Sequence, residues 1–139
     1  MVIIVAVDDP AEDERIVEEG AFLASNLREE LHVLHVIEYE ELMDEPLEGD
    51  TTPDRRTVRQ RATDHAKRVA SAVTDEFTPI GRVGKPASEI ISYAEETDAT
   101  YLVIGGRNRS PVGKAVFGSV TQKVIMRSPC PVVTVLEQD

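Results

Sequence analysis

The chain has 139 residues, enough for one buried core but not for two, so we expect a single domain over residues 1–139. Its 26 acidic and 15 basic residues give a net charge of −11, which argues against nucleic acid as a partner because a polyanion would be repelled. No apolar run approaches the ~20 residues of a membrane span, so no membrane partner is expected either.

The beginning of the chain and its cysteine content favour a cytoplasmic protein. The apolar run Val2–Val7 is short and has no cationic segment before it, unlike a signal peptide. Cys130 is the single cysteine and cannot form an internal disulfide. The acidic, lysine-poor composition is typical of halophilic proteins, whose salt-loaded cytoplasm screens most of the self-repulsion; an ordinary acidic protein is the alternative.

The first part of the chain predicts a strand, a helix and a second strand. The β-branched run Val2–Val7 is typical of a strand covered on both faces in a parallel sheet. Asp9 offers a helix cap with Pro10 at the first helical position, and apolar residues at helical spacing predict a helix from Pro10 to about Glu30. Leu31–Ile37 has the composition of a second buried strand.

A polar interruption separates this unit from the next helix. Residues 38–50 are rich in acids and carry a proline and a glycine, which predicts a solvated loop. Thr52 then offers a cap in front of Pro53. The apolar spacing that follows predicts a long helix reaching Val73, with His65 on its buried face as a packed residue.

The alternation of strand and helix continues in the second half. Phe77–Gly84 predicts a third strand, and Pro79 places it at a sheet edge because proline lacks a ladder donor. Pro86 opens another helix, and Ala99–Ile104 predicts a fourth strand.

The carboxyl-terminal part predicts one more helix and strand. Ser119 and Gln122 have the spacing of a capping box at a helix start. Pro131–Leu136 is an apolar run that predicts the fifth strand. Strands that alternate with helices throughout indicate an α/β fold, an open five-stranded parallel sheet with helices on both faces, of the Rossmann-like kind.

Two histidines in the second strand are interpreted as structural. His32 and His35 are three residues apart, so their side chains point to opposite faces of the sheet, which argues against a shared metal ion. No other metal-ligand spacing is present, and no catalytic constellation can be identified. The sequence therefore gives no catalytic residue, and an enzyme is not expected.

A glycine-rich loop follows the fourth strand, with the sequence GGRNRSPVGKAVFGS over residues 105–119. In an open α/β sheet the ligand crevice lies beyond the carboxyl ends of the strands, where the strand order reverses. Gly105 and Gly106 would let a ligand approach the backbone closely, and the helix from Ser119 would direct free N–H groups at an anion. Arg107, Arg109 and Lys114 add positive charge to this loop, so it predicts a phosphate site.

Two common phosphate motifs do not fit this loop. A Walker A motif needs glycine where Asn108 lies and Ser or Thr where Ala115 follows Lys114. A dinucleotide fingerprint needs closely spaced glycines after the first strand, where Asp8, Asp9 and Pro10 stand instead.

The loop resembles that of the nucleotide-binding members of the universal stress protein family. Their motif is Gly, two residues, Gly, nine residues and Gly-Ser/Thr, and here Gly105 matches its first glycine and Gly118-Ser119 its final pair. Asn108 stands at the second glycine. Asparagine adopts the left-handed backbone more readily than other non-glycine residues, but its side chain would intrude on the phosphates.

The resemblance covers nearly all of the chain and implies a nucleotide-binding site. The ligand that the resemblance implies is ATP, ADP or AMP, with or without a bound Mg²⁺ ion. Asp8 is implied at the ribose or adenine, Val36 at the adenine edge, and the loop residues at the ribose and phosphates. The implied nucleotide-binding residues are Ala6, Val7, Asp8, Val36, Ile104, Gly105, Arg107, Asn108, Gly118, Ser119, Val120 and Thr121.

The resemblance also implies the strand order 3-2-1-4-5 and a homodimer formed through the fifth strand. Val132, Val133, Thr134 and Val135 would form that edge. An apolar edge left open presents unpaired N–H and C=O groups, which pairing with a second copy satisfies. Proline at Val133 or Val135 is expected to weaken the dimer at whichever position donates across the edge.

The function implied is that of an ATP- or adenine-nucleotide-binding universal stress protein that acts as a sensor or regulator of the stress response. The alternative is a stress or interaction module that binds no nucleotide because Asn108 alters the phosphate loop. Protein partners beyond the second copy are not identified by the sequence.

Overall fold

The computed structural model describes residues 1–8, 13–38, 54–106 and 117–136. Five parallel strands form one sheet in the order β3-β2-β1-β4-β5, which confirms the predicted fold and strand order. In chain order the elements are β1 Val2–Ala6, α1 Glu14–Leu27, β2 Glu30–Ile37, α3 Arg55–Ser71, β3 Thr78–Val83, α4 Pro86–Thr97, β4 Tyr101–Gly106, α5 Ser119–Arg127 and β5 Val132–Leu136.

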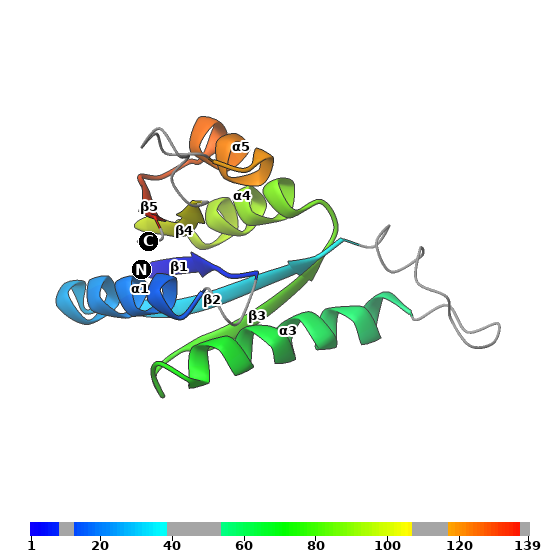
Figure 1. Ribbon diagram of the computed structural model, residues 1–139, viewed down its shortest axis with the longest axis horizontal. Coiled ribbons are helices and arrows are strands. Elements are labelled where there is room, and N and C mark those ends of the chain that lie inside the picture. The colour runs from blue at the N-terminus through cyan, green and yellow to red at the C-terminus, as the bar shows by residue number, and fades with distance from the viewer. Residues whose placement is uncertain (9–12, 39–53, 107–116, 137–139) are drawn as a thin grey trace, which may run out of the picture.

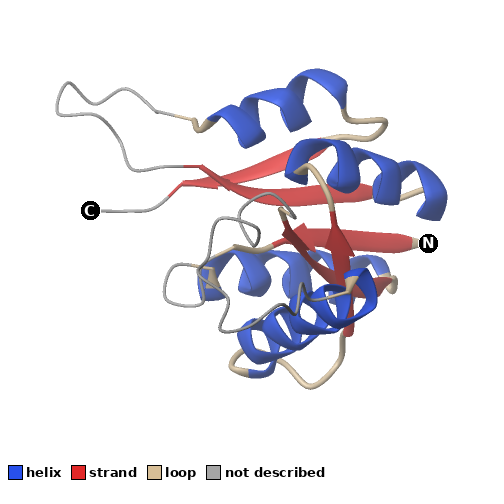
Figure 2. Ribbon diagram, turned by 90° about the vertical axis from the view of Figure 1, so that its right-hand side faces the viewer, coloured by secondary structure: helices blue, strands red, loops and turns tan. Residues whose placement is uncertain are grey.

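Helices cover both faces of the sheet (Figure 1). Alternate residues of β1 belong to two separate apolar clusters, because successive side chains of a strand point to opposite faces. Ile3 and Val5 pack with α1 and α3, whereas Val2 and Ile4 pack with α4 and α5. Figure 2 shows the resulting arrangement of strands between two layers of helices.

The first helix is shorter than predicted at both ends. Asp13 precedes it as the N-cap residue, so α1 begins at Glu14, and residues 9 and 10 lie outside the described residues. At the other end Arg28 takes a left-handed backbone (φ 55°), and its N–H bonds to the carbonyl of Ser25. Glu30 already belongs to β2, so the predicted end of the helix at Glu30 was wrong. The left-handed turn at Arg28 ends the helix and reverses the direction of the chain.

Two helix caps also differ from the predicted ones. The cap of α3 is Asp54, whose carboxylate accepts a 2.7 Å hydrogen bond from the backbone N–H of Thr57. This bond holds the pKa of Asp54 below its ordinary value. The N-cap of α5 is Gly118 rather than Ser119, and the amide of Gln122 donates instead to the carbonyl of Phe117 (2.9 Å).

The edge strand β3 is protected by two arginines of α3. In an edge strand the backbone groups of alternate residues point away from the sheet. The Gly84 N–H bonds to the Ile37 carbonyl of β2, so the backbone groups of Gly81 and Val83 point outward. The guanidinium of Arg59 donates to the Gly81 carbonyl (3.3 Å), and that of Arg55 to the Val83 carbonyl (3.2 Å). These bonds cover part of the outer edge of β3.

Candidate functional site

The carboxyl ends of β1 and β4 lie side by side where the strand order reverses. The chain runs outward from β1 to β2 and β3, and then returns to the other side of β1 as β4. Ala6 is paired with Leu34 of β2 and with Ile104 of β4. Val7 and Asp8 therefore extend beyond the sheet next to Gly105 and Gly106, as the sequence predicts.

All but one of the predicted apolar site residues belong to the apolar cluster on one side of the sheet. Ala6 and Ile104 are buried in the cluster beneath α4 and α5, and Val36 and Val120 pack against it. Val7 is buried on the opposite face. Ala6, Val36, Ile104 and Val120 together form an apolar wall at the predicted ligand crevice.

The two glycines at the end of β4 have side-chain neighbours that restrict these positions. A Cβ atom at Gly105 would overlap Cδ1 of Ile16 in α1. A Cβ atom at Gly106 would lie 2.7 Å from Leu136 and 3.1 Å from the ring of Phe117. A larger residue at either position would require these neighbouring side chains to shift, so packing favours glycine here in addition to the close ligand approach predicted from the sequence.

The start of α5 is attached directly to the end of β4. The buried Thr121 hydroxyl donates to the carbonyl of Gly105 (3.0 Å), so the two ends of the glycine motif lie together in space. Gly118 has no side chain that could cap α5, and Ser119 is exposed. The first N–H groups of this helix are thus placed at the crevice with the positive end of the helix dipole.

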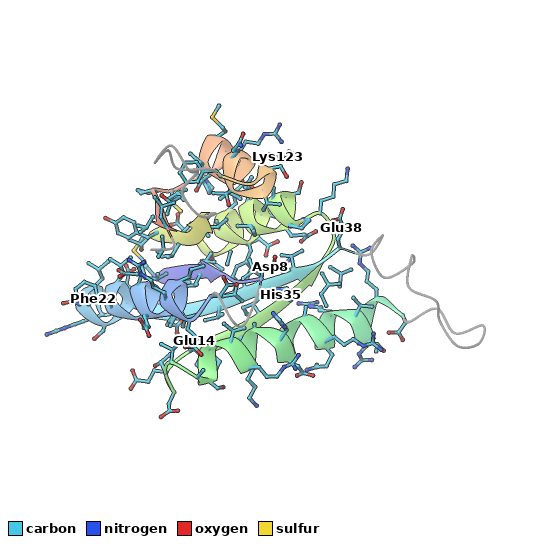
Figure 3. All side chains as sticks on the ribbon, viewed as in Figure 1. Asp8, Glu14, Phe22, His35, Glu38 and Lys123 are labelled. Atoms are coloured by element: carbon cyan, nitrogen blue, oxygen red, sulfur yellow. The ribbon has the colours of Figure 1, made fainter. Side chains whose placement is uncertain are left out.

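Asp8 is exposed, while its backbone is held on both sides. Its N–H donates to the carboxylate of Asp13, and its carbonyl accepts a 2.6 Å hydrogen bond from Nε2 of His65. His35 donates from Nδ1 to the carbonyl of Val7 (2.8 Å). Figure 3 shows Asp8 and His35 next to each other at this end of the sheet.

The histidine pair is the part of the site that sequence reasoning missed. His32 does point to the other face, where Nδ1 lies 2.6 Å from the hydroxyl of Tyr93. His35, however, meets His65 of α3, with 4.1 Å between the ring centroids. The available signal was the position of His35 near the end of its strand together with that of His65 on the buried helix face.

Stability is expected to fall as the pH drops from about 6.5, the ordinary pKa of histidine, toward the lowered pKa of His35. Burial lowers the pKa of His35 from 6.5; the Val7 carbonyl opposes this, His65 adds to it, and Asp8 opposes it. Between the lowered value and 6.5 the unfolded chain binds a proton that the folded chain does not bind. The free energy of unfolding therefore decreases with falling pH, by at most about 1.4 kcal/mol per pH unit for one group.

Denaturant unfolding of the wild type and His35→Asn between pH 7.5 and 5 measures this effect. Asparagine keeps an N–H donor for the Val7 carbonyl but does not titrate. The variant is expected to show a shallower pH dependence, and equal slopes for both proteins would contradict the assignment to His35.

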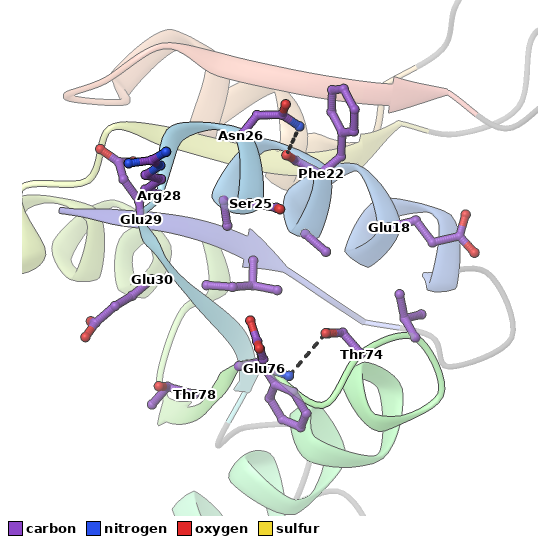
Figure 4. Close-up of a pocket in the computed structure, with 15 residues that line it drawn as sticks. Glu18, Phe22, Ser25, Asn26, Arg28, Glu29, Glu30, Thr74, Glu76 and Thr78 are labelled. Atoms are coloured by element: carbon purple, nitrogen blue, oxygen red, sulfur yellow. Dashed lines mark hydrogen bonds between the residues drawn. The ribbon is translucent and has the colours of Figure 1, made fainter.

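A groove of about 930 Å³ lies at the opposite, amino-terminal end of the strands. It runs between α1 and the segment that joins α3 to β3, and Phe22, Leu31 and Thr78 are among its lining residues (Figure 4). None of the predicted nucleotide-binding residues lines it.

Part of the predicted site cannot be placed. Arg107 and Asn108 lie outside the described residues, as do Arg109 and Lys114. Over the described ranges no group of three or more His, Cys, Asp or Glu side chains is arranged to hold a metal ion. In the same part of the chain, no helix is both long and apolar enough to span a membrane.

Comparison with protein families decides the classification of the chain. The sequence profile of the universal stress protein family matches residues 1–135. The chain belongs to the universal stress protein family.

Individual universal stress proteins resemble it over most of their length. The universal stress protein YxiE of Bacillus subtilis is 28% identical over 142 residues, which cover 95% of this chain and 96% of YxiE. A universal stress protein of Archaeoglobus fulgidus has a structure with a TM-score of 0.70, 30% identity and coverage of 96% and 97% of the two chains. A second structure from that organism, a complex with dAMP, has a TM-score of 0.67, 26% identity and 96% coverage of each chain.

Proposed function

We propose that this universal stress protein binds an adenine nucleotide, namely ATP, ADP or AMP, between the carboxyl ends of β1 and β4. The observation that carries the proposal is the Thr121 hydrogen bond to Gly105, because it joins the strand end and the helix start that together would form the phosphate site. The dAMP complex of the Archaeoglobus fulgidus protein supports the choice of nucleotide.

Each described residue has a defined role in the proposal. The apolar wall of Ala6, Val36 and Ile104 would pack against the adenine base. The exposed carboxylate of Asp8 would accept hydrogen bonds from the ribose hydroxyls or the adenine amine. Ser119 and the neighbouring N–H groups of α5 would bind the phosphates.

The remaining members of the proposed site are assigned by the family motif. Arg107 would contribute charge to the phosphates, and Asn108 would form the loop backbone around them. Mg²⁺ would be held mainly by the phosphates and water, as this ion usually is, with few protein ligands.

The proposed role is that of a cytoplasmic sensor or regulator of the stress response, in which bound nucleotide changes conformation or partner choice. The physical requirement is a difference in affinity for the nucleotide between two conformations.

Equilibrium binding of ATP, ADP and AMP, with and without Mg²⁺ and at high salt, tests the proposal. Wild-type protein and the variant Asn108→Gly are compared. Similar binding by both supports the nucleotide function. Binding by the variant alone identifies the natural protein as an interaction module with an altered phosphate loop. No binding by the folded wild type at millimolar nucleotide contradicts the proposal.

We also propose that two copies associate through β5. The N–H of Leu102 bonds to the carbonyl of Pro131, and backbone groups alternate along a strand, so Pro131, Val133 and Val135 face β4. Val132 and Thr134 then point their backbone groups outward. This corrects the choice of Val133 or Val135 as test positions, since proline there would break the bonds within the sheet.

Thr134→Pro is expected to weaken the dimer about thirtyfold. Each copy would lose one outward N–H donor, and two hydrogen bonds of about 1 kcal/mol are lost per dimer. Sedimentation equilibrium at several salt concentrations measures the effect, with Thr134→Val as the control that keeps the donor. A wild-type monomer at micromolar concentration, or a dimer unaffected by Thr134→Pro, would contradict association through β5.

A further inference from the structure

Two stacked histidines hold the chain where it leaves β1. His35 comes from β2 and His65 from α3, and their ring centroids are 4.1 Å apart. Nδ1 of His35 lies 2.8 Å from the Val7 carbonyl oxygen, and Nε2 of His65 lies 2.6 Å from the Asp8 carbonyl oxygen. Two successive carbonyls just beyond β1 are thus bound by side chains from two other elements.

These bonds determine the hydrogen positions on both rings. A carbonyl oxygen can only accept, so His35 carries its proton on Nδ1 and His65 carries its proton on Nε2. Since His35 is buried, a charged pair would bring two cations close together in a poorly solvated place. The carboxylates of Asp8 and Asp13 are the acidic groups next to this turn.

The bonds also determine which part of Asp8 is available to a ligand. Its N–H is occupied by the carboxylate of Asp13 and its carbonyl by His65, whereas the residue as a whole is exposed. With the backbone bound at both polar groups, the direction of the Asp8 side chain is restricted. Side-chain position matters because a charged hydrogen bond requires good alignment.

We propose that His35 and His65 are positioning residues that fix the turn at Val7 and Asp8, so that the Asp8 carboxylate faces the nucleotide crevice. This inference rests on the proposed nucleotide function. None of the residues of α3 is predicted to contact the ligand. Through the Asp8 backbone, this helix would nevertheless affect the affinity for nucleotide.

The test compares variants of His65 that keep or lose the donor. His65→Gln retains an N–H group near the position of Nε2, whereas His65→Ala and the bulkier His65→Met retain none. ATP affinity is expected to fall about tenfold in the two variants without a donor and to stay within about twofold of wild type in His65→Gln. His32→Ala, which removes a histidine on the opposite face, is the control and is expected to leave affinity unchanged.

A second measurement is independent of nucleotide binding. Hydrogen exchange of the Asp8 amide is expected to accelerate about tenfold in the donor-free variants and to remain at the wild-type rate in His65→Gln. Equal ATP affinity in all folded His65 variants, or an unchanged Asp8 exchange rate in the donor-free variants, overturns the inference. If the wild-type protein binds no nucleotide, the proposed function fails, and His65 cannot position a ligand contact. Faster exchange of the Asp8 amide in the donor-free variants would in that case still show that His65 holds the turn.

Discussion

Replacing Gly81 with alanine is expected to lower the free energy of unfolding by about 3 kcal/mol. The methyl group would overlap the backbone carbonyl of Arg59 and the backbone amide of Thr63, where α3 lies directly on β3. A side chain can rotate away from such an overlap, but the backbone of a helix cannot, so α3 must move off the sheet. The Arg59 bond that covers the Gly81 carbonyl would be lost with it.

Thermal and denaturant unfolding measure this change. The expected loss corresponds to a decrease of roughly 10 °C in the midpoint of a domain of this size. Thr78→Ala, at an exposed position of the same strand, is the control and is expected to change stability by less than about 0.5 kcal/mol. A Gly81→Ala protein as stable as this control would show that α3 does not approach β3 as closely as described.

Replacing Asp8 with asparagine is expected to weaken adenine-nucleotide binding about thirtyfold. A hydrogen bond to a charged group contributes about 1.5 to 3 kcal/mol, and asparagine keeps the shape of the side chain but loses its charge. Because the Asp8 side chain is exposed and its backbone bonds remain, stability should change little.

Titration of folded protein with ATP measures the affinity of this variant. Asp75→Asn makes the same chemical change at an exposed position before β3, at the other end of the sheet, and is the control. Wild-type affinity in Asp8→Asn would exclude the carboxylate from the binding site, whatever the ligand.

The fold could be predicted from sequence because its central strand is apolar on both faces. Val2–Ala6 is a fully buried and largely β-branched run, Glu30–Ile37 is largely apolar, and the alternation of strands with helices leaves few arrangements. Helix starts were less predictable. Asp9 and Asp13, or Thr52 and Asp54, are similar capping residues, and tertiary packing decides between them.

The candidate site was predictable where it depends on local sequence. Asp8, Gly105 and the start of α5 follow from strand ends and from the glycine spacing. The His35 and His65 pair depends on how α3 lies over β2, which no short motif records. The arginine cover of β3 and the outward direction of Thr134 likewise require the register of the strands.

Mapping of bound ATP by amide chemical shifts tests the central claim most directly, because it separates the proposed crevice from the groove at the other end of the strands. We expect ATP to shift the amides of Val7 and Asp8 after β1, of Gly105 and Gly106 at the end of β4, and of Ser119 at the start of α5. The groove residues Phe22, Leu31 and Thr78 should remain unchanged. Shifts confined to that groove, or no shifts at millimolar ATP, would contradict it.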